Sequence, residues 1–440
     1  MGAKDALIGR LLGNAQKFND EQIAQTIRLL IEHGVKREAS DIHLEPHEQV
    51  VVVRYRIDGD LRGVHKLPGA ALPALLAQLK EQAHLKPAVS NVPQEGQFKL
   101  TIGKHDVVIR LATLPVVGGE KAVLHLTPQR DQAQPLEALG FWGDGLQAIQ
   151  STLARPHGLV LVAGPKRAGK TATLYSLLEL VSTPNLNSST VEELIEHKLP
   201  GVNQTQVHPK AGITFAEGLQ AVLKQDSNVI MVSNLPDQQA TELAVHAATT
   251  GHLVLAGLHA DSAAQALLQV RATGVQPFLL ASAVRAAIGQ RLVRKLCERC
   301  RERYELTDDE RSAIEHAFAL PTPTLRRRVH ELEQQAAKEH VGSVGPASST
   351  AAHLTHAWRA HPDGCEACDH SGYLGRISIV EVLIPTKPLR TLLLEHTTPA
   401  ALEAAVRKTE FIPLHIDGLV KALRGLTTIE EVLRAIPYAA

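Results

Sequence analysis

The stretch from residue 158 to residue 181 constrains the fold of this chain most strongly. Gly158-Leu-Val-Leu-Val-Ala163 is an unbroken apolar run, typical of a strand buried on both faces of a parallel sheet. The motif G-x-x-x-x-G-K-T follows directly, and the next residues place Leu174, Leu177 and Val181 on one helical face. A strand, a glycine-bounded loop and a helix in this order predict a phosphate-binding loop.

The chemistry of such a loop requires these residue types. Backbone N–H groups of the loop and of the helix start surround phosphate oxygens. Lys170 would reach the terminal phosphates of ATP, and the hydroxyl of Thr171 would bind Mg²⁺. The residues predicted to contact the nucleotide are Gly164, Pro165, Gly169, Lys170, Thr171 and Ala172.

Two more apolar strands are predicted at 229–232 and 253–258, each followed by a helical stretch. Strand–helix alternation implies a doubly wound α/β core, which we place at residues 136–296. Before it, an amphipathic helix at 19–38, within an N-terminal helical segment 1–38, leads into an α+β domain at 39–135. Its strands are expected within 41–61 and near 97–103, 106–113 and 121–126, with a helix near 70–85.

The four cysteines form two C-x-x-C pairs, Cys297 with Cys300 and Cys365 with Cys368. This spacing lets both thiolates of a pair bind one tetrahedral ion, so we predict a structural Zn²⁺ site; free thiols or a redox pair are the alternatives. The zinc subdomain is expected at 297–380. Its charged and then Gly/Ser-rich insertion, 322–352, is interpreted as a short exposed helix and a flexible linker.

The last segment, residues 381–440, is predicted to be helical. Gly425 is expected to end one helix, and Thr427-x-x-Glu430 to open the next as a capping box.

The charge balance excludes one class of partner. Lys+Arg and Asp+Glu are both 46, so no strong electrostatic binding of nucleic acid is expected. No run approaches the ~20 apolar residues of a membrane span, and no signal peptide is evident. We therefore expect a cytoplasmic protein without direct membrane insertion.

Several motifs in order resemble the secretion ATPases that power type II secretion and type IV pilus assembly. They are Ser40-Asp-Ile-His-Leu-Glu-Pro46, Arg54-Tyr-Arg-Ile-Asp-Gly59, the phosphate loop, Pro209-Lys-Ala-Gly-Ile-Thr-Phe215, Thr250-Gly-His-Leu-Val-Leu255 with His259, and Asp417-Gly followed by Thr427-Thr-Ile-Glu-Glu-Val-Leu433. We expect the chain to lack the extra N-terminal domain of longer members.

The resemblance implies a PAS-like N-domain before a RecA-like ATPase domain, a homo- or hetero-hexameric ring, and an inner-membrane platform protein as partner. It also implies site residues. Glu192 and Glu193 fall on an acidic box, His252 and His259 on a histidine box, and Arg110 on an N-domain arginine near the nucleotide. Either histidine could equally be a hydrogen-bonded residue at a strand end.

The sequence departs from the family pattern at the catalytic positions. Asn234 occupies the position of the Walker B glutamate, and an amide cannot accept a proton from water. Other substituted positions are Arg167 for a loop glycine, Pro236, Gln97, His125 and Gln220 for arginines, and Ser90-Asn91 for an arginine pair. We therefore expect an ATP-binding motor-type subunit with impaired hydrolysis. The alternatives are a non-catalytic scaffold in a mixed ring with an active paralogue, an ordinary active motor, and an unrelated P-loop enzyme.

Overall fold

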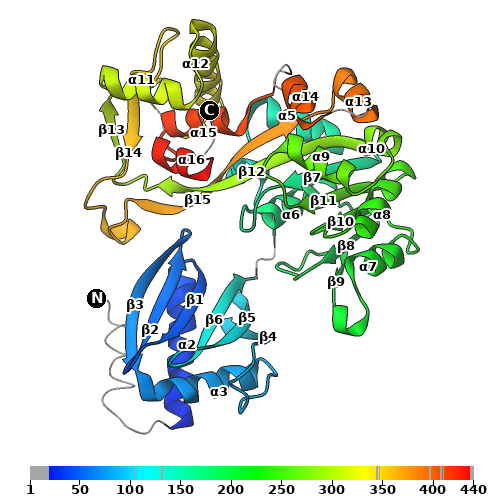
Figure 1. Cartoon of the computed structure of the whole chain (residues 1–440). Helices are drawn as coiled ribbons and strands as arrows, with labels where there is room; N and C mark the ends of the chain where they lie inside the picture. The colour runs from blue at the N-terminus through cyan, green and yellow to red at the C-terminus, as the bar shows by residue number, and fades with distance from the viewer. Residues whose placement is uncertain are drawn as a thin grey trace. The chain divides into compact units, whose positions relative to one another are not determined.

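The chain forms two compact units, Met1–Arg130 and Asp131–Ala440 (Figure 1). The structure is a computed structural model that describes residues 19–436 except 104, 130–131, 343–344, 346, 396–397, 407–408 and 410. Residues 1–18 of the predicted N-terminal helical segment lie outside the described residues.

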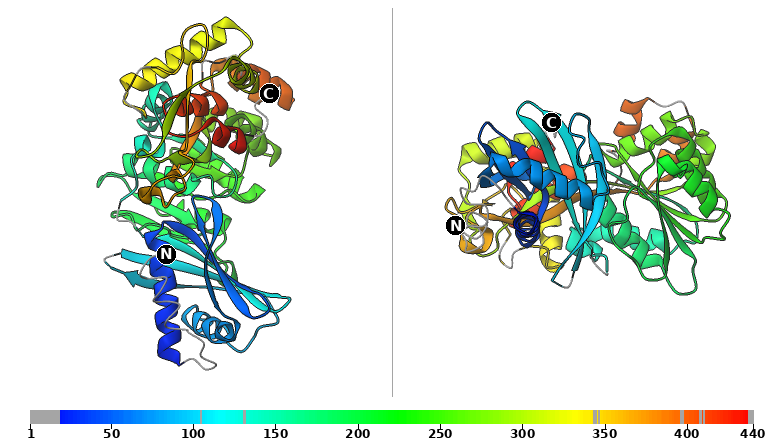
Figure 2. Two further views of the ribbon diagram at one scale, coloured as in Figure 1. Left: turned by 90° about the vertical axis from the view of Figure 1, so that its left-hand side faces the viewer. Right: turned by 90° about the horizontal axis from the view of Figure 1, so that it is seen from below.

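The N-terminal unit is a six-stranded antiparallel sheet in the order β3-β2-β1-β6-β5-β4. Its strands are β1 (Ala39–Pro46), β2 (Val50–Ile57), β3 (Asp60–Pro68), β4 (Gln94–Ile102), β5 (His105–Val116) and β6 (Gly119–Pro128). Helices α2 (Asp20–Lys36) and α3 (Leu72–Gln82) pack on one face of the sheet (Figure 2). The predicted helices and strands of this region are therefore confirmed.

Local signals explain the element ends in this unit. Asn19 caps α2 through a capping box with Gln22. The turn at Asp58-Gly59 joins β2 to β3, and both residues have positive φ, as a tight hairpin requires. The apolar stripe Ile23, Ile27, Leu30 and Ile31 is buried against the sheet.

The second unit contains a seven-stranded sheet in the order β15-β12-β7-β11-β10-β8-β9, in which β12 pairs with β7 in parallel and only β15 is antiparallel to its neighbour. The strands are β7 (Gly158–Ala163), β8 (Ser188–Glu192), β9 (Val202–Gln206), β10 (Val229–Val232), β11 (Leu253–Leu258), β12 (Val284–Leu296) and β15 (Tyr373–Leu383). The predicted doubly wound α/β core is confirmed.

Helices cover both faces of this sheet, which explains its unbroken apolar strands. On one face α4 (Leu136–Leu139), α5 (Gly143–Leu153) and α6 (Lys170–Val181) pack against Val160 and Val162. On the other face Leu159 and Leu161 belong to one hydrophobic cluster with residues of α7 (Phe215–Val222), α8 (Gln238–Thr249), α9 (Ala263–Ala272), α10 (Pro277–Ala283), α13 (Lys387–Leu394) and α14 (Pro399–Val406).

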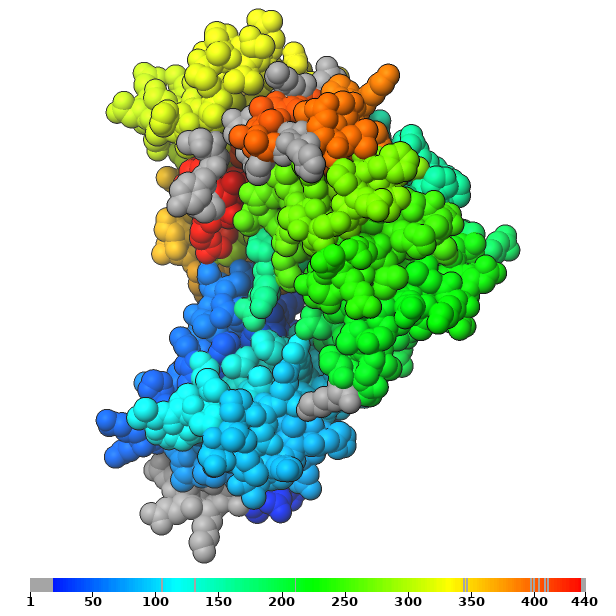
Figure 3. Space-filling model, turned by 45° about the vertical axis from the view of Figure 1, so that its right-hand side comes forward, coloured from blue at the N-terminus to red at the C-terminus, as the bar shows by residue number. Residues whose placement is uncertain are grey.

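The prediction of a short exposed helix within 322–352 is wrong, and residues 343–344 and 346 of the predicted flexible linker lie outside the described residues. Helix α12 (Pro323–Lys338) follows α11 (Asp308–Ala317) and buries Val329, Leu332 and Ala336, while its other side forms the yellow surface in Figure 3. Glu333 of α12 is fully buried and accepts hydrogen bonds from the Ser348 N–H and the Ser349 hydroxyl. These bonds attach Ser348 and Ser349 to the helix. The many charged residues of α12 hid its buried face from the sequence pattern.

Strands β13 (Glu302–Glu305) and β14 (His356–Arg359) lie before and after this insertion in the chain, and they pair to form a small two-stranded sheet. The C-terminal helices are α15 (Leu414–Leu423) and α16 (Ile429–Ala435). Gly425 has φ +70° after α15, as predicted. The predicted capping residue of α16 is wrong by one position: Thr428 accepts from the Glu431 N–H, whereas Thr427 donates to the Arg294 carbonyl.

Candidate nucleotide-binding site

The candidate site lies at one edge of the seven-stranded sheet. β7, β11, β10 and β8 are parallel and in register, so their carboxyl ends meet there. This edge places the phosphate loop after β7, His259 after β11, Asn234 after β10 and Glu193 after β8. Open α/β sheets bind ligands at this edge.

Two glycines allow the phosphate loop to turn tightly. A Cβ on Gly164 would lie 2.7 Å from the Ala168 Cβ and 2.8 Å from the Gln290 carbonyl oxygen. Gly169 has φ +84°, a conformation that glycine adopts without strain. Arg167 also has a positive φ, +65°, although it carries a Cβ. The loop thus retains the backbone of a glycine at a position where the sequence has arginine.

This strain makes Arg167→Gly a stabilising substitution. We expect it to raise the free energy of unfolding by about 1 kcal/mol, because glycine removes the penalty of the left-handed backbone. The matched control is Lys166→Gly, whose backbone φ is not positive and which we expect to destabilise by about 0.5–1 kcal/mol. Urea unfolding of both variants measures the difference. Equal effects of the two glycines would contradict the strain argument.

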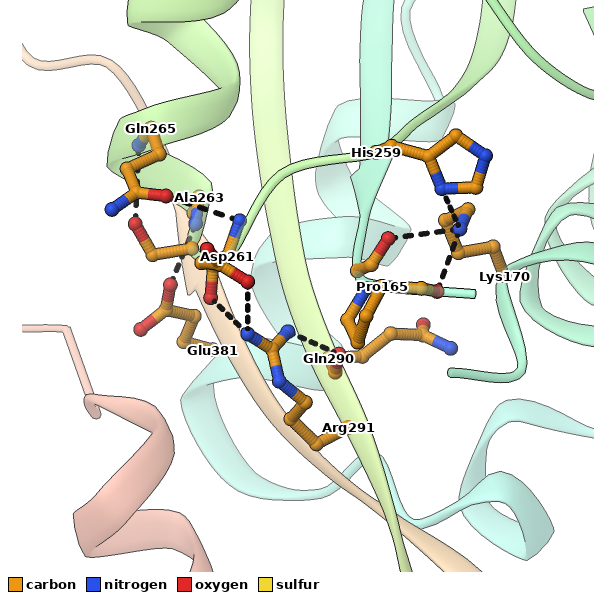
Figure 4. Close-up of polar contacts among 11 residues, drawn as sticks. Pro165, Lys170, His259, Asp261, Ala263, Gln265, Gln290, Arg291 and Glu381 are labelled. Carbon is orange, nitrogen blue, oxygen red and sulfur yellow. Dashed lines mark hydrogen bonds and ion pairs between the residues drawn. The ribbon is translucent and has the colours of Figure 1, made fainter. Parts of the chain in front are cut away.

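Lys170 begins α6 and bends back over the loop (Figure 4). Its Nζ donates to the carbonyl oxygens of Gly164 (2.8 Å) and Pro165 (2.9 Å) and lies 3.1 Å from Nδ1 of His259. Burial lowers the pKa of Lys170 to about 8, so the ammonium remains mostly charged at neutral pH. Desolvation and the Lys170 charge lower the pKa of His259, which favours a neutral imidazole beside the ammonium.

Glu192 at the end of β8 and Glu193 directly after it differ in their surroundings. Glu192 is fully buried and accepts hydrogen bonds from the hydroxyls of Tyr175 and Thr190 and from Nε2 of Gln204 (3.0 Å). The structure thus directs Glu192 inward, away from the loop, because alternate residues of a strand face opposite sides. Glu193 is exposed at the edge, where its N–H donates to the Ser233 hydroxyl.

Glu196 was not assigned a role from the sequence, although it closes the same acidic box. Its side chain is hydrogen-bonded to Thr171, the predicted Mg²⁺ ligand. Burial raises its pKa to about 7, and the neighbouring Glu192 adds to this effect. A carboxyl group that titrates near neutrality beside the loop hydroxyl can accept a proton or bind a cation.

Asn234 follows β10 in a segment tied to both neighbouring strands. The Ser233 N–H donates to the Val191 carbonyl, and the Leu235 N–H donates to the Gly257 carbonyl. The side-chain Oδ1 of Asn234 is buried and has no hydrogen-bond partner among the described residues. A buried acceptor of this kind fits a bound water or ligand atom.

Three residues of the site's surroundings carried no sequence signal. Gln290 and Arg291 lie on β12, and Glu381 lies on β15. Arg291 donates to the carbonyl and carboxylate oxygens of Asp261 (both 2.9 Å), and Glu381 accepts from the Ala263 N–H (2.6 Å) at the start of α9 (Figure 4). Arg291 and Glu381 therefore hold the chain that follows His259. Gln290, Arg291 and Glu381 reach the candidate site only because strands that are distant in sequence pair in the sheet.

One predicted residue is not brought to this edge, and another belongs to the other unit. His252 lies at the opposite end of β11, where its carbonyl accepts from the Gly158 N–H and its Nδ1 lies 3.0 Å from the Ala247 carbonyl. Arg110 belongs to the N-terminal unit and pairs with Glu95 across β4 and β5. Gln97 and His125 flank Arg110 in register, so three of the expected N-domain positions form one row.

The four cysteines converge from two segments: Cys297 and Cys300 follow the end of β12, and Cys365 and Cys368 precede β15. The sulfur atoms of Cys297 and Cys365 are 3.7 Å apart, those of Cys300 and Cys368 3.8 Å, and all four lie within 4.8 Å of one another. A tetrahedral ion with Zn–S bonds of about 2.3 Å needs S···S distances of about 3.8 Å. A disulfide needs about 2.05 Å. The geometry therefore fits a four-thiolate metal site.

The fold and the loop define an α/β protein of the P-loop type. The chain belongs to the family described as type II/IV secretion system protein, which matches residues 16–434. It is 37% identical over 417 residues to the type IV pilus assembly ATPase PilB of Thermus thermophilus, covering 94% of this chain and 43% of that protein. It is 36% identical over 416 residues to type II secretion system protein E of Dickeya dadantii, covering 94% and 76%.

Solved structures agree on the fold. The ATPase DotB of Legionella pneumophila matches with a TM-score of 0.62 at 17% identity, covering 94% of this chain and 95% of that one. The pilus retraction motor PilT with bound ADP matches with a TM-score of 0.57 at 20% identity, covering 92% and 95%. Within the described part of the chain, no helix is long and apolar enough to cross a membrane.

Proposed function

We propose that this protein is an ATP-binding, motor-type subunit of a type IV pilus assembly or type II secretion machine. The observation that carries the proposal is the phosphate loop, with Lys170 beside His259 at the carboxyl edge of the sheet. Lys170 would exchange its bonds to the loop carbonyls for the terminal phosphates of ATP. The family and the named relatives support the assignment.

The residues present fit Mg²⁺ beside the nucleotide. Thr171 supplies a hydroxyl, and the Glu196 carboxyl bonded to it supplies the oxygen ligand that Mg²⁺ prefers. The ion would neutralise charge on the transferring phosphoryl group. Within the chain, Glu196 would orient the Thr171 hydroxyl. The Oδ1 of Asn234, which is buried without a partner among the described residues, would orient a water molecule without taking its proton.

Slow hydrolysis is part of the proposal. Asn234 supplies an amide where a general base is needed, and Gln220 on α7 supplies no cation. The alternative, a non-catalytic scaffold that joins an active paralogue in a mixed ring, rests on the same residue. Turnover of the protein alone, compared with its turnover beside a co-purified ATPase, separates the two.

We further propose a PAS-like identity for the N-terminal unit and a structural Zn²⁺ for the cysteine site. The six-stranded antiparallel sheet with helices on one face supports the first, and the sulfur distances support the second. Family membership supports assembly into a hexameric ring, homo- or heteromeric, in the cytoplasm, held at the inner membrane by a platform protein. No nucleic acid is expected as partner.

Nucleotide binding is tested by Lys170→Ala. We expect an affinity for a fluorescent ATP analogue about 30-fold weaker than that of the unaltered protein, because a charge-assisted bond to phosphate contributes about 2 kcal/mol. The matched control, Lys166→Ala, removes an exposed lysine of the same loop and is expected to change affinity by less than about 3-fold. An unaltered affinity in Lys170→Ala would overturn the proposal.

A further inference from the structure

Gln290 lies on strand β12 near the phosphate loop (Figure 4), and its side chain contacts that loop. Its side chain is fully buried. The amide Nε2 donates to the Ala168 carbonyl (2.7 Å), and the amide Oε1 accepts from the Thr173 hydroxyl (2.8 Å). The two bonds fix which way the amide faces, because Thr173 donates to the oxygen and Ala168 accepts from the nitrogen.

The loop glycines also pack against this residue. A Cβ on Gly164 would lie 2.8 Å from the Gln290 carbonyl oxygen, and a Cβ on Gly169 would lie 3.2 Å from its Nε2. Both contacts are tighter than a side chain tolerates comfortably. The two glycines of the motif are therefore needed on the Gln290 side of the loop, independently of any close approach to phosphate.

The bond to Ala168 determines where a loop N–H points. In a planar trans peptide the C=O and the following N–H point in opposite directions. The Ala168 carbonyl is held inward, toward Gln290, so the Gly169 N–H is directed outward. An outward N–H can bind a phosphate oxygen, whereas an outward carbonyl would repel it.

We propose that Gln290 is the positioning residue that sets the Ala168–Gly169 peptide in its phosphate-binding orientation. This proposal rests on the proposed function. It adds that nucleotide binding requires a residue of β12, a strand outside the loop motif. Without the Nε2 donor, the Ala168 carbonyl loses its buried partner, and the peptide is free to rotate its oxygen toward the anion. Gln290 itself does not touch the nucleotide.

Gln290→Glu gives a readout that simple packing would not produce. Burial raises the pKa of a carboxyl at this position. At low pH the protonated acid donates its O–H to the Ala168 carbonyl and replaces the amide; at high pH the carboxylate only accepts and repels that carbonyl. The affinity of the variant for a fluorescent ATP analogue, relative to the unaltered protein, is expected to be within about 2-fold at pH 5.5 and about 10-fold or more weaker at pH 8.5.

Because the affinity is compared with that of the unaltered protein at each pH, the effects of other titrating groups cancel in the ratio. The charged or titratable groups around the loop are Lys166, Arg167, Lys170, Glu193, Glu196, His259 and Arg291, and none of them is replaced in the variant. The matched control is Gln150→Glu, the same change at an exposed position of α5, with an expected ratio near 1 throughout. A ratio for Gln290→Glu that stays flat across the pH range would overturn the proposal.

A second variant covers the case in which Gln290→Glu does not fold. Gln290→Met keeps the length and apolar packing but has no donor, and we expect about 10-fold weaker binding that no pH restores. Binding equal to that of the unaltered protein would overturn the role of Gln290. Failure of the unaltered protein itself to bind nucleotide would instead overturn the proposed function, so the two failures are distinguishable.

Discussion

Asn234→Glu is expected to raise the ATP turnover of this protein by about 100-fold or more, because it supplies the missing general base. Asn234 directly follows the strand end that the Ser233 and Leu235 hydrogen bonds fix, and its Oδ1 is buried without a partner among the described residues. A carboxylate there can accept a proton from the attacking water, whereas the amide can only orient that water. Steady-state phosphate release at saturating ATP and Mg²⁺ measures the effect.

The matched control is Asn234→Gln, which has the length of glutamate without its charge. It is expected to give no gain, since an amide accepts no proton. The double variant Asn234→Glu with Lys170→Ala should return to background, which excludes a contaminating ATPase. Unaltered protein that already turns over at about 1 per second or faster, with no gain in Asn234→Glu, would contradict impaired hydrolysis.

Loss of the proposed Zn²⁺ site is expected to have the second large effect. The protein should contain one zinc ion per chain, and Cys365→Ser should lose it together with about 5 kcal/mol or more of stability. The metal would join β12 to the loop before β15, so its loss frees the ends of the insertion between them. A fall of about 10 °C or more in the midpoint of thermal unfolding is expected.

The control for the metal site is Glu366→Ser. Glu366 is exposed between Cys365 and Cys368, so the variant changes the same turn and introduces the same residue while leaving all four thiols. Its zinc content and thermal midpoint should match those of the unaltered protein. Metal analysis without zinc, together with an unchanged midpoint in Cys365→Ser, would contradict the structural site.

Local chemistry explains why much of the fold could be predicted. The apolar runs at 158–163, 229–232 and 253–258 coincide with β7, β10 and β11. A strand that is buried on both faces can be predicted without knowing which strands it pairs with, because its continuous apolar composition differs from the rest of the chain. Predictions failed where a helix was polar in composition. α12 has many charged residues and yet buries one face, which its neighbours determine.

The candidate site divides in the same way. The phosphate loop and the cysteine pairs are contiguous motifs, because each needs its residues at fixed spacing along the chain. Glu192 and Glu196 lie four residues apart in one acidic box, but only Glu196 is hydrogen-bonded to Thr171. Which carboxyl faces the loop depends on how the chain turns after β8.

The sequence by itself determined the parallel core, the loop motif and the cysteine pairs, since each is a matter of residue type and short-range spacing. Only the tertiary structure decided that Gln290, 122 residues beyond Ala168, holds the loop. It also decided that His252 and His259 lie at opposite ends of one strand. Strand order and strand direction fix such contacts, and they depend on the burial of the whole sheet.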